Sequence, residues 1–535
     1  MLSYRKLAMR VLGHPLHTGG IDSPRPASQR AAAFILTAAM LTTLAAPAFA
    51  DIWHIENGDI TISAGESGNN VTQNNNTTYG DTNTIITNQN KDKASSHTVT
   101  IETNDKNDKV EVTLKDVNID TSSRNKAAVS VTGSGNTTIK LDGDNALKSD
   151  IYRSGIYGSG SLTISGGEND SLTAQGGSGA NGISSSGSLT ISGGTVTANG
   201  DDGGRGISSS GSVTISGGST VTANGGSGTI SGGDGIWSGG GGTISGGSTV
   251  TANGGNGGSL VGGDGIRSGG GLTVSDGTVT AKGGNGDSKD GYGGDGIRSG
   301  GVVTISGNTV NAAGGYGGKV GGYGICSFDR VAISGGTVEA AGGNGSTGGG
   351  SGIYSSVIDL SGSLELTAKA GSPNGKALSQ NGSELVLDTI KDKLGPGAKV
   401  TATDADGKVI DQVSTPRPVE PEESSSSSDG GSSAPSAPAS PLPGLTVTDK
   451  DGQRISYTST QSGNTLTVCV GRLTASFRIS LAALRQLRAE GIETIAFQTV
   501  LCSTTLSVDE LLAMGGENAE AVLTHRFTDS SLTVG

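Results

Sequence analysis

Between residues 155 and 352, apolar and polar residues alternate in short runs that repeat eight times. Each repeat approximates Gly-Ile-x-Ser, then (Leu/Val)-Thr-Ile-Ser-Gly-Gly, then Thr-Val-Thr-Ala-Asn-Gly-Gly. The Gly-Ile pairs are 24 to 31 residues apart and begin at Gly155, Gly182, Gly206, Gly235, Gly265, Gly296, Gly324 and Gly352. Period-two alternation predicts strands with one buried face, and three such strands in a repeat of this length predict a stacked solenoid.

The alternation also assigns a direction to each side chain. The Ile of each Gly-Ile pair, the Leu and Ile of the second run and the Val of Thr-Val-Thr are expected to point inward. Three inward-facing strands per turn predict an all-β fold, a three-sided parallel β-helix, which the crossover rule makes right-handed. Gly-Gly pairs after the second and third strands are expected at corners, where φ > 0 or crowding excludes a Cβ atom.

Composition and pattern divide the rest of the chain into segments. Residues 59–141 contain five further alternating runs, whereas the Asn-rich stretch 68–90 is expected to be a loop or a frayed cap. The predicted segments are a signal peptide (1–50), irregular N-terminal coils with a cap (51–150), regular Gly-rich repeats (151–352), closing coils (353–412), a disordered Ser/Pro-rich linker (413–443) and a small α+β domain (444–535).

The N-terminal segment predicts export. Several arginines and a lysine precede an apolar run from Ala31 to Ala46, and Ala48-Phe49-Ala50 offers small residues at a cleavage site. We expect a mature chain that begins at Asp51, lies outside the cell or on its surface and has no membrane span. An uncleaved anchor is the alternative.

Composition narrows the class further. A hydrophobic share of 32% with 95 glycines cannot fill an ordinary globular core, whereas each coil of a solenoid needs only a few inward aliphatic residues. The net charge of -13 argues against nucleic acid as a partner. We expect a monomeric repeat domain.

The position after each Gly-Ile pair is the first candidate site. It must point outward, and in the eight repeats its occupants are Tyr157, Ser184, Ser208, Trp237, Arg267, Arg298, Cys326 and Tyr354. Aromatic faces stack on the C–H surfaces of sugars, and Arg forks onto hydroxyls or carboxylates. The sequence therefore predicts a polysaccharide or surface glycan on Tyr157, Trp237, Arg267, Arg298 and Tyr354, the alternative being exposed strand residues without a ligand.

Acidic residues and cysteines give two further predictions. Asp234, Asp264 and Asp295 precede the Gly-Ile pair in three successive coils, where they could bind Ca²⁺ or pair with Arg267 and Arg298. No other cofactor is indicated. Cys469 and Cys502 form a disulfide if the exported domain oxidises, and two free thiols are the alternative.

Residues 95–150 carry a resemblance. The runs 110–119, 127–129 and 138–147 resemble a secreted clostridial and gut Firmicutes family of carbohydrate-binding right-handed β-helix proteins, similar in shape to pectate lyases. The resemblance implies plant-polysaccharide binding and calcium without a need for catalysis.

Three functions follow as expectations. The first is a secreted or cell-surface, non-catalytic polysaccharide-binding protein. The second is an adhesin or structural surface spacer without a glycan site. The third is a calcium-dependent polysaccharide lyase, for which Asp264, Asp295, Arg267 and Arg298 form the only suitable cluster, because no histidine lies in the repeats.

Overall fold

The computed structural model describes residues 51–286 and 289–416, followed in the C-terminal part by residues 444–448, 454–455, 457–462, 464–470, 475–499, 503–514, 519–525 and 530–534. The predicted signal peptide and residues 417–443 of the predicted linker lie outside the described residues. The chain divides into two compact units, Met1–Glu420 and Pro421–Gly535.

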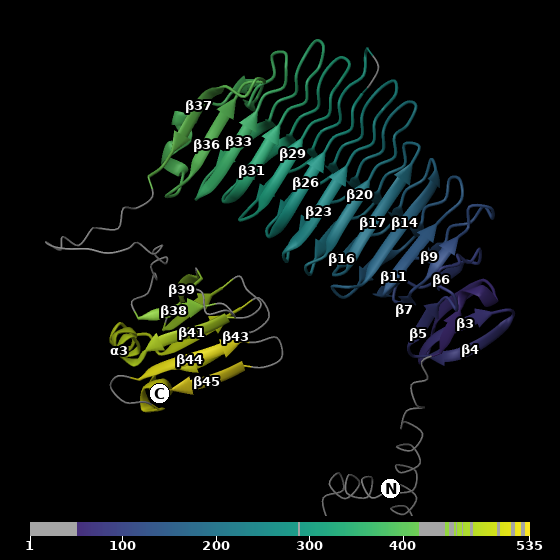
Figure 1. Cartoon of the computed structure of the whole chain (residues 1–535), viewed down its shortest axis with the longest axis horizontal. Coiled ribbons are helices and arrows are strands. Elements are labelled where there is room, and N and C mark those ends of the chain that lie inside the picture. Colours follow the sequence, from purple (N-terminus) through teal and green to yellow (C-terminus); the bar gives the residue numbers. More distant parts are fainter. Residues whose placement is uncertain are drawn as a thin grey trace, which may run out of the picture. The chain divides into compact units, whose positions relative to one another are not determined.

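The first unit confirms the predicted parallel β-helix, with three strands in each regular turn (Figure 1). Face 1 contains the Gly-Ile strands, and each pairs in parallel with its equivalent in the next turn. The strands of face 1 are β2 (Ile60–Gly65), β6 (Val99–Thr103), β9 (Val129–Gly133), β12 (Ile156–Gly158), β15 (Ile183–Ser185), β18 (Ile207–Ser209), β21 (Ile236–Ser238), β24 (Ile266–Ser268), β27 (Ile297–Ser299), the first parts of β30 (Ile325–Ile333) and β32 (Ile353–Leu360), and β34 (Leu378–Gln380). The right-handed turn stays a prediction.

Face 2 contains the second run of each repeat and ends in the second parts of β30 and β32. Its other strands are β1 (Ile52–His54), β5 (Thr84–Thr87), β7 (Lys109–Lys115), β10 (Asn136–Asp142), β13 (Ser161–Ser165), β16 (Leu189–Ser192), β19 (Val213–Ser216), β22 (Gly242–Ile244), β25 (Leu272–Val274) and β28 (Val303–Ile305).

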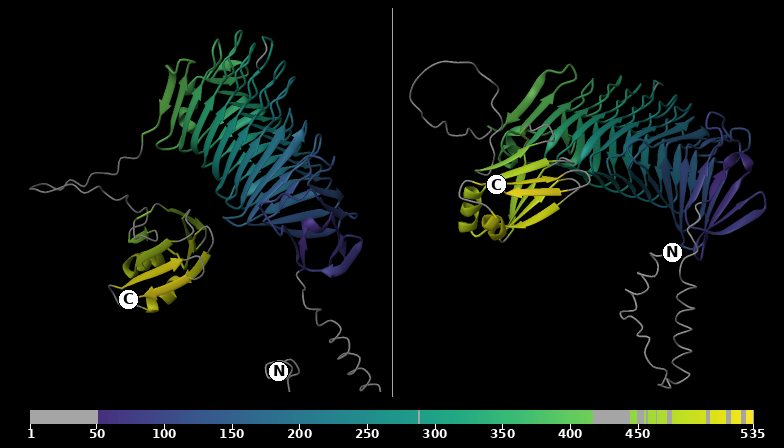
Figure 2. Two further views of the ribbon diagram at one scale, coloured as in Figure 1. Left: turned by 45° about the vertical axis from the view of Figure 1, so that its right-hand side comes forward. Right: turned by 60° about the horizontal axis from the view of Figure 1, so that its bottom comes forward.

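Face 3 is a sheet of twelve strands that contains the Thr-Val-Thr runs (Figure 2). All its neighbours are parallel except the last pair, in which β37 (Val409–Ser414) runs antiparallel to β36. The other strands are β8 (Asn118–Asp120), β11 (Asp144–Lys148), β14 (Ser171–Ser178), β17 (Thr195–Asp201), β20 (Thr220–Asn224), β23 (Ser248–Asn253), β26 (Gly277–Lys282), β29 (Thr309–Ala313), β31 (Gly336–Ala341), β33 (Leu364–Lys369) and β36 (Lys399–Thr403).

The core consists of like residues stacked on like. Val250 of β23 pairs with Val221 of β20 and Val279 of β26, and all three are fully buried. The inward Ile and Leu residues of the other two faces are buried in the same way. Truncating one such residue to Ala costs about 2–5 kcal/mol, because neighbouring coils cannot close the cavity.

The Asn-rich stretch differs from the expectation of a loop or frayed cap. It forms β3 (Gly68–Gln73), which pairs antiparallel with β2, and β4 (Asn76–Asp81), which pairs antiparallel with β3. The short 3-10 helix η1 (Ile55–Asn57) precedes β2. Asn69 is buried, and its Nδ2 donates to Oγ1 of Thr84 at 2.9 Å and to the carbonyl of Glu111 at 2.8 Å. Asparagine here satisfies backbone and side-chain groups at the N-terminal end of the solenoid, which composition alone does not reveal.

The C-terminal end of the solenoid is closed differently. The two-residue strand β35 (Ser383–Glu384) pairs antiparallel with β34, and the 3-10 helix η2 (Leu387–Lys393) buries Leu387 and Ile390. Together with the antiparallel β37, these elements cover strand edges that would otherwise be open to pairing with another chain.

The variable segments between face 3 and the next Gly-Ile pair are stacked loops along one edge (Figure 1). Parallel bridges join Gly228, Gly257, Gly286 and Gly317 in successive loops, and others join Val261, Tyr292 and Val320. At the base of each loop the two legs hydrogen-bond to each other and to the next coil. For example, the N–H of Gly263 donates to the carbonyl of Gly255, and the N–H of Gly284 donates to the carbonyl of Gly263, both at 2.8 Å.

The two sets of Gly-Gly pairs have different physical causes. Gly217 and Gly218, after a face 2 strand, have φ of 68° and 70°, a left-handed conformation that disfavours other residues. After face 3, in pairs such as Gly254–Gly255, glycine is required because the backbone lies directly against other backbone. The same holds on the opposite leg of the loop, where a Cβ atom on Gly263 would overlap the carbonyl oxygen of Gly233 in the preceding coil.

In its described residues, the second unit has two four-stranded sheets and two helices, α3 (Leu481–Ala489) and α4 (Val508–Met514). Ser480 caps α3, with its side chain accepting the N–H of Ala483. Strand β39 spans Thr458–Ser462. The sheets are β38 (Leu445–Thr448), β41 (Ala475–Ser480), β44 (Glu520–His525) and β45 (Ser530–Val534), and β39, β40 (Thr465–Cys469), β42 (Thr494–Gln498) and β43 (Ser503–Ser507).

Two glycine substitutions should separate crowding from backbone conformation. Gly218→Ala introduces a Cβ with no atom within 4 Å, so only the left-handed φ opposes it and the cost should be about 1–2 kcal/mol. Gly263→Ala should be considerably more destabilising, because carbonyl groups of the crossing backbone must move. Thermal unfolding of both variants measures this, and equal melting temperatures would show that close backbone approach does not constrain the loops.

Candidate functional site

Backbone pairing places the residues that follow Ile on face 1 in one continuous row. The pairs Ser208–Trp237, Trp237–Arg267 and Arg267–Arg298 are all in register across successive coils. The complete outward row is Tyr157, Ser184, Ser208, Trp237, Arg267, Arg298, Cys326 and Tyr354. The structure therefore brings Trp237, Arg267 and Arg298 onto adjacent coils, whereas Tyr157 lies three coils before Trp237 and Tyr354 two coils beyond Arg298.

The members of the outward row differ in exposure. Tyr157 is 40% exposed and Arg267 is also exposed, whereas Trp237, Arg298 and Tyr354 are half-buried. Ser208 and Cys326 are buried, which differs from the expectation that the whole row faces solvent. Ser208 lies beside the larger Trp237 in the row, and Cys326 lies between Arg298 and Tyr354. Burial raises the pKa of the Cys326 thiol to about 12.

Two of the predicted aromatic residues already have a partner within the chain. The guanidinium of Arg205 lies 4.5 Å from the ring centroid of Trp237. Tyr354 stacks on Tyr323 with ring centroids 4.8 Å apart and planes inclined by 18°. One face of each ring is therefore occupied, and a ligand would meet the other face or the ring edge.

The three predicted metal ligands form a buried ladder. Asp234, Asp264 and Asp295 are only 3–6% exposed. The backbone N–H of Asp264 donates to Oδ1 of Asp234 at 3.0 Å, and that of Asp295 donates to Oδ1 of Asp264 at 2.8 Å. The N–H of Tyr323 continues the ladder onto Oδ1 of Asp295 at 2.7 Å. Each carboxylate therefore binds the backbone of the following coil.

The second oxygen of each carboxylate faces an arginine. Oδ2 of Asp234 lies 3.0 Å from Nε of Arg205, and Oδ2 of Asp295 lies 3.1 Å from Nη1 of Arg298. The corresponding distance from Asp264 to Nη1 of Arg267 is 4.0 Å. Because each carboxylate binds backbone through one oxygen and has an arginine beside the other, this set does not fit a calcium site. Among the residues that the structure describes, no three His, Cys, Asp or Glu side chains are grouped to hold a metal ion.

Burial dominates the electrostatics of the ladder. Burial and the charges of Asp295 and Asp234 raise the pKa of Asp264 to about 8. Burial also raises the pKa of Asp295, although the N–H of Tyr323 and the charge of Arg298 oppose the rise. Stacked carboxylates at coil spacing repel one another, so a proton on Asp264 at neutral pH relieves the repulsion.

A groove of about 610 Å³ runs beside the central part of the outward row. Arg205, Arg267 and Arg298 line it, with side chains that are 36–48% exposed. The stacked loops contribute Val261, Tyr292 and Val320, which the bridges described above align along the groove. The buried Asp234, Asp264 and Asp295 also belong to the lining, behind the arginines. The groove, hereafter the central groove, therefore combines a row of arginines paired with buried aspartates and an apolar and aromatic row.

A second hollow of about 660 Å³ lies on the same face, in the N-terminal coils. Its lining includes Tyr157 and Ser130 of the strands and Lys126, Tyr152 and Arg153 of the preceding loops. The sequence pattern identified only Tyr157, because the loop residues lie outside the eight repeats.

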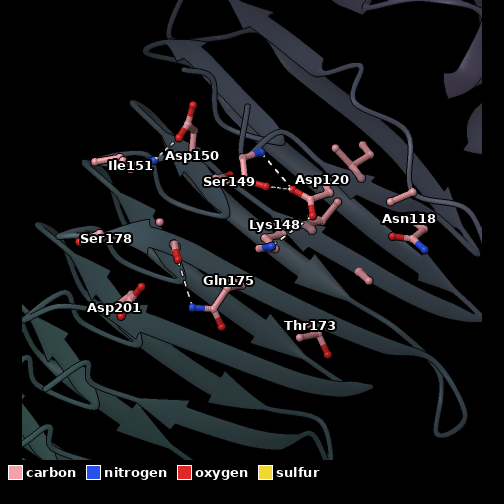
Figure 3. A pocket seen from close by; sticks show the side chains of 17 residues that line it. Asn118, Asp120, Lys148, Ser149, Asp150, Ile151, Thr173, Gln175, Ser178 and Asp201 are labelled. Atoms are coloured by element: carbon pink, nitrogen blue, oxygen red, sulfur yellow. Dashed lines mark hydrogen bonds and ion pairs between the residues drawn. The ribbon is translucent and has the colours of Figure 1, made fainter. Parts of the chain in front are cut away.

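A third hollow, of about 760 Å³, lies against face 3 (Figure 3). Lys148 of β11 forms an ion pair of 3.2 Å with Asp120 on the adjacent β8, and Gln175 follows on β14. Asp150 and Asp201 also line this hollow, which makes it acidic. One sequence signal points to this hollow. The row that reads Asn199, Asn224 and Asn253 in later coils begins with the charged residues Asp120 and Lys148.

The predicted disulfide is not tested. Within the described residues Cys469 has no disulfide partner, and its Sγ donates to Oε1 of Gln498 at 3.4 Å. Cys502 lies outside the described residues, so the pairing stays a prediction.

Comparison with known proteins gives no relative. No family model matches the chain, and neither a curated protein nor a solved structure is detectably similar. The specific clostridial carbohydrate-binding family therefore stays a resemblance in residues 95–150, while the β-helix itself is shown. In the part of the chain that the structure describes, every helix is too short or too polar to cross a membrane.

The ladder predicts how stability depends on pH. The folded-state pKa of Asp264 lies above its value in an unfolded chain, so the native state holds the proton more tightly and stability falls as pH rises from about 4 to about 8. Asp264→Asn should flatten this dependence, because Asn is neutral and can still accept the N–H of Asp295. Asn181 already accepts the N–H of Arg205 in this way at 2.8 Å.

The measurement is the melting temperature of both proteins across that pH range. A parental slope that persists unchanged in Asp264→Asn would contradict the assignment of a raised pKa to this carboxyl group.

Proposed function

We propose that the mature chain is an exported, non-catalytic protein that binds a polysaccharide along the outward row. The observation that carries the proposal is the central groove, in which Arg205, Arg267 and Arg298 run parallel to Val261, Tyr292 and Val320. A sugar presents both C–H faces and hydroxyl groups, so a groove that combines apolar and cationic rows offers contacts to each. Because the rows follow the coil axis, a linear polymer suits the groove better than a compact ligand.

The carboxylates support a binding role more than a catalytic one. Glycosidases need two carboxyl groups that reach the scissile bond, and lyases need a base within hydrogen-bond distance of the substrate. Asp264 and Asp295 line the groove, but both are buried and hydrogen-bonded to the backbone of the next coil, so little of either carboxyl group is left to reach a polymer. We therefore do not propose the lyase.

A surface spacer without a glycan site is the second candidate. The observation that favours it is the internal pairing of Trp237 with Arg205 and of Tyr354 with Tyr323. Rings that are held in place by their own neighbours need no ligand to explain them.

Arg267→Ala should separate these two candidates. Arg267 is the most exposed of the three arginines, and the loss of a charge-assisted hydrogen bond should weaken retention on the cognate polysaccharide about tenfold. The measurement is retention of the mature protein on insoluble cellulose, pectin and mucin, with folding checked by circular dichroism.

Arg330→Ala is a matched control. Arg330 lies 4.0 Å from Asp359, and its side chain is 50% exposed. Arg267 lies at the same distance from Asp264, and its side chain is 48% exposed. Unlike Arg267, Arg330 lies outside the central groove. Retention should be unaffected by this control. If Arg267→Ala is retained as well as the parent, or if no polysaccharide retains the parent, the spacer is the better account.

A further inference from the structure

The hollow in the N-terminal coils has an unusual charge for this chain. The protein carries a net charge of -13, yet the only charged residues that line this hollow are Lys126 and Arg153, both cations. By contrast, three aspartates accompany three arginines in the central groove, and aspartates predominate in the hollow against face 3.

The two cations are fixed in different ways. Nζ of Lys126 lies 2.9 Å from Oδ2 of Asp59. The same carboxylate accepts hydrogen bonds from Nη1 of Arg124 at Oδ1 and from Nη2 of Arg124 at Oδ2. Asp59 therefore positions Lys126 but is shared between two cations. Arg153 donates from Nε to Oδ1 of Asn125 at 3.3 Å and forms no ion pair within the described part of the chain. An excess of positive charge thus remains at the hollow.

Tyr152 is the second unusual feature. Its φ is 58°, in the left-handed region that a bulky residue rarely adopts, and its side chain is largely exposed. The N–H of Tyr152 donates to the carbonyl of Ser178, and Gly179, with φ of 73°, holds the corresponding turn of the next coil. The ring of Tyr152 lies against Gly179, where a Cβ atom would be 3.0 Å from the ring. A glycine in place of Tyr152 would relieve this backbone strain, yet the chain has a tyrosine at this position on the rim of the hollow.

The remaining lining supplies hydroxyl groups and a second ring. Tyr157 is partly exposed on the outward row, and Thr100, Ser130 and Ser184 occupy the same row on neighbouring coils. Hydroxyl, ammonium and guanidinium donors around one hollow suit an anion with three acceptor oxygens, which a sulfate or phosphate ester provides. Two tyrosines suit the ring that carries the ester.

We propose that this hollow binds a saccharide unit bearing a sulfate or phosphate ester, with the ring against Tyr152 and Tyr157 and the ester at Lys126 and Arg153. The inference rests on the proposed function for the saccharide nature of the ligand. It adds a site separate from the central groove and a chemical class for its ligand.

Calorimetric titration of the mature chain tests this proposal. The ligands are glucose 6-sulfate, glucose 6-phosphate, glucose, galacturonate and inorganic sulfate or phosphate. We expect at least one ester to bind about tenfold more tightly than glucose or galacturonate, and more tightly than its inorganic anion. Tighter binding of one of the two esters shows whether the hollow takes a sulfate or a phosphate ester. Equal binding of glucose and the esters, or of the inorganic anions and the esters, would overturn the proposal.

Two variants locate the site. Arg153→Gln should weaken ester binding about tenfold, whereas Arg330→Gln, an arginine outside the hollow, should not. Tyr152→Gly should also weaken ester binding while the melting temperature is unchanged or higher, since glycine relieves the left-handed backbone. Ester binding that survives both Arg153→Gln and Tyr152→Gly would place the ligand elsewhere.

Arg267→Ala keeps the two proposals distinguishable. It should reduce retention on polysaccharide and leave ester binding unchanged. Polysaccharide retention without ester binding would overturn only this inference, and ester binding without polysaccharide retention would overturn only the role of the central groove.

Discussion

The structure depends on one constraint, the in-register stacking of each coil on the next by backbone hydrogen bonds. Inside the solenoid this register aligns rows of Ile, Leu and Val, as at Val221, Val250 and Val279. At the base of the stacked loops it brings backbone against backbone, as where Gly263 meets Gly233. Many glycines of the described coils therefore follow from close backbone approach or from left-handed corners, and these say little about flexibility.

The same register sets the chemistry of the outer surface. A side chain at one repeat position lies one coil from its equivalent, so like charges accumulate unless something neutralises them. At Asp234, Asp264 and Asp295 the solution combines backbone N–H donors, neighbouring arginines and a raised pKa for Asp264. The buried acids in turn hold the arginines at the edge of the central groove. A structural requirement of stacking and a candidate binding surface thus share the same residues.

Much of this fold could be predicted from the sequence, because a short repeat imposes its own register. Period-two alternation identified the inward residues and the outward row without any knowledge of the structure. It predicted a cap in this region but not that the paired strands β3 and β4 form it, since buried Asn69 looks like a loop residue in composition. Nor could it predict that Cys326 is buried, that Arg205 stacks on Trp237, or that Tyr152 and Arg153 line a hollow. These features depend on which side chains neighbouring coils and loops place together.

The central claim is that the mature protein recognises glycans through the arginine-lined groove without calcium. A glycan array probed with residues 51–535, with and without a chelator, tests it most directly. The account predicts binding to a defined set of linear glycans that is unchanged by the chelator and reduced in Arg267→Ala. Binding that disappears with the chelator, or an array on which the parent protein binds nothing, would contradict it.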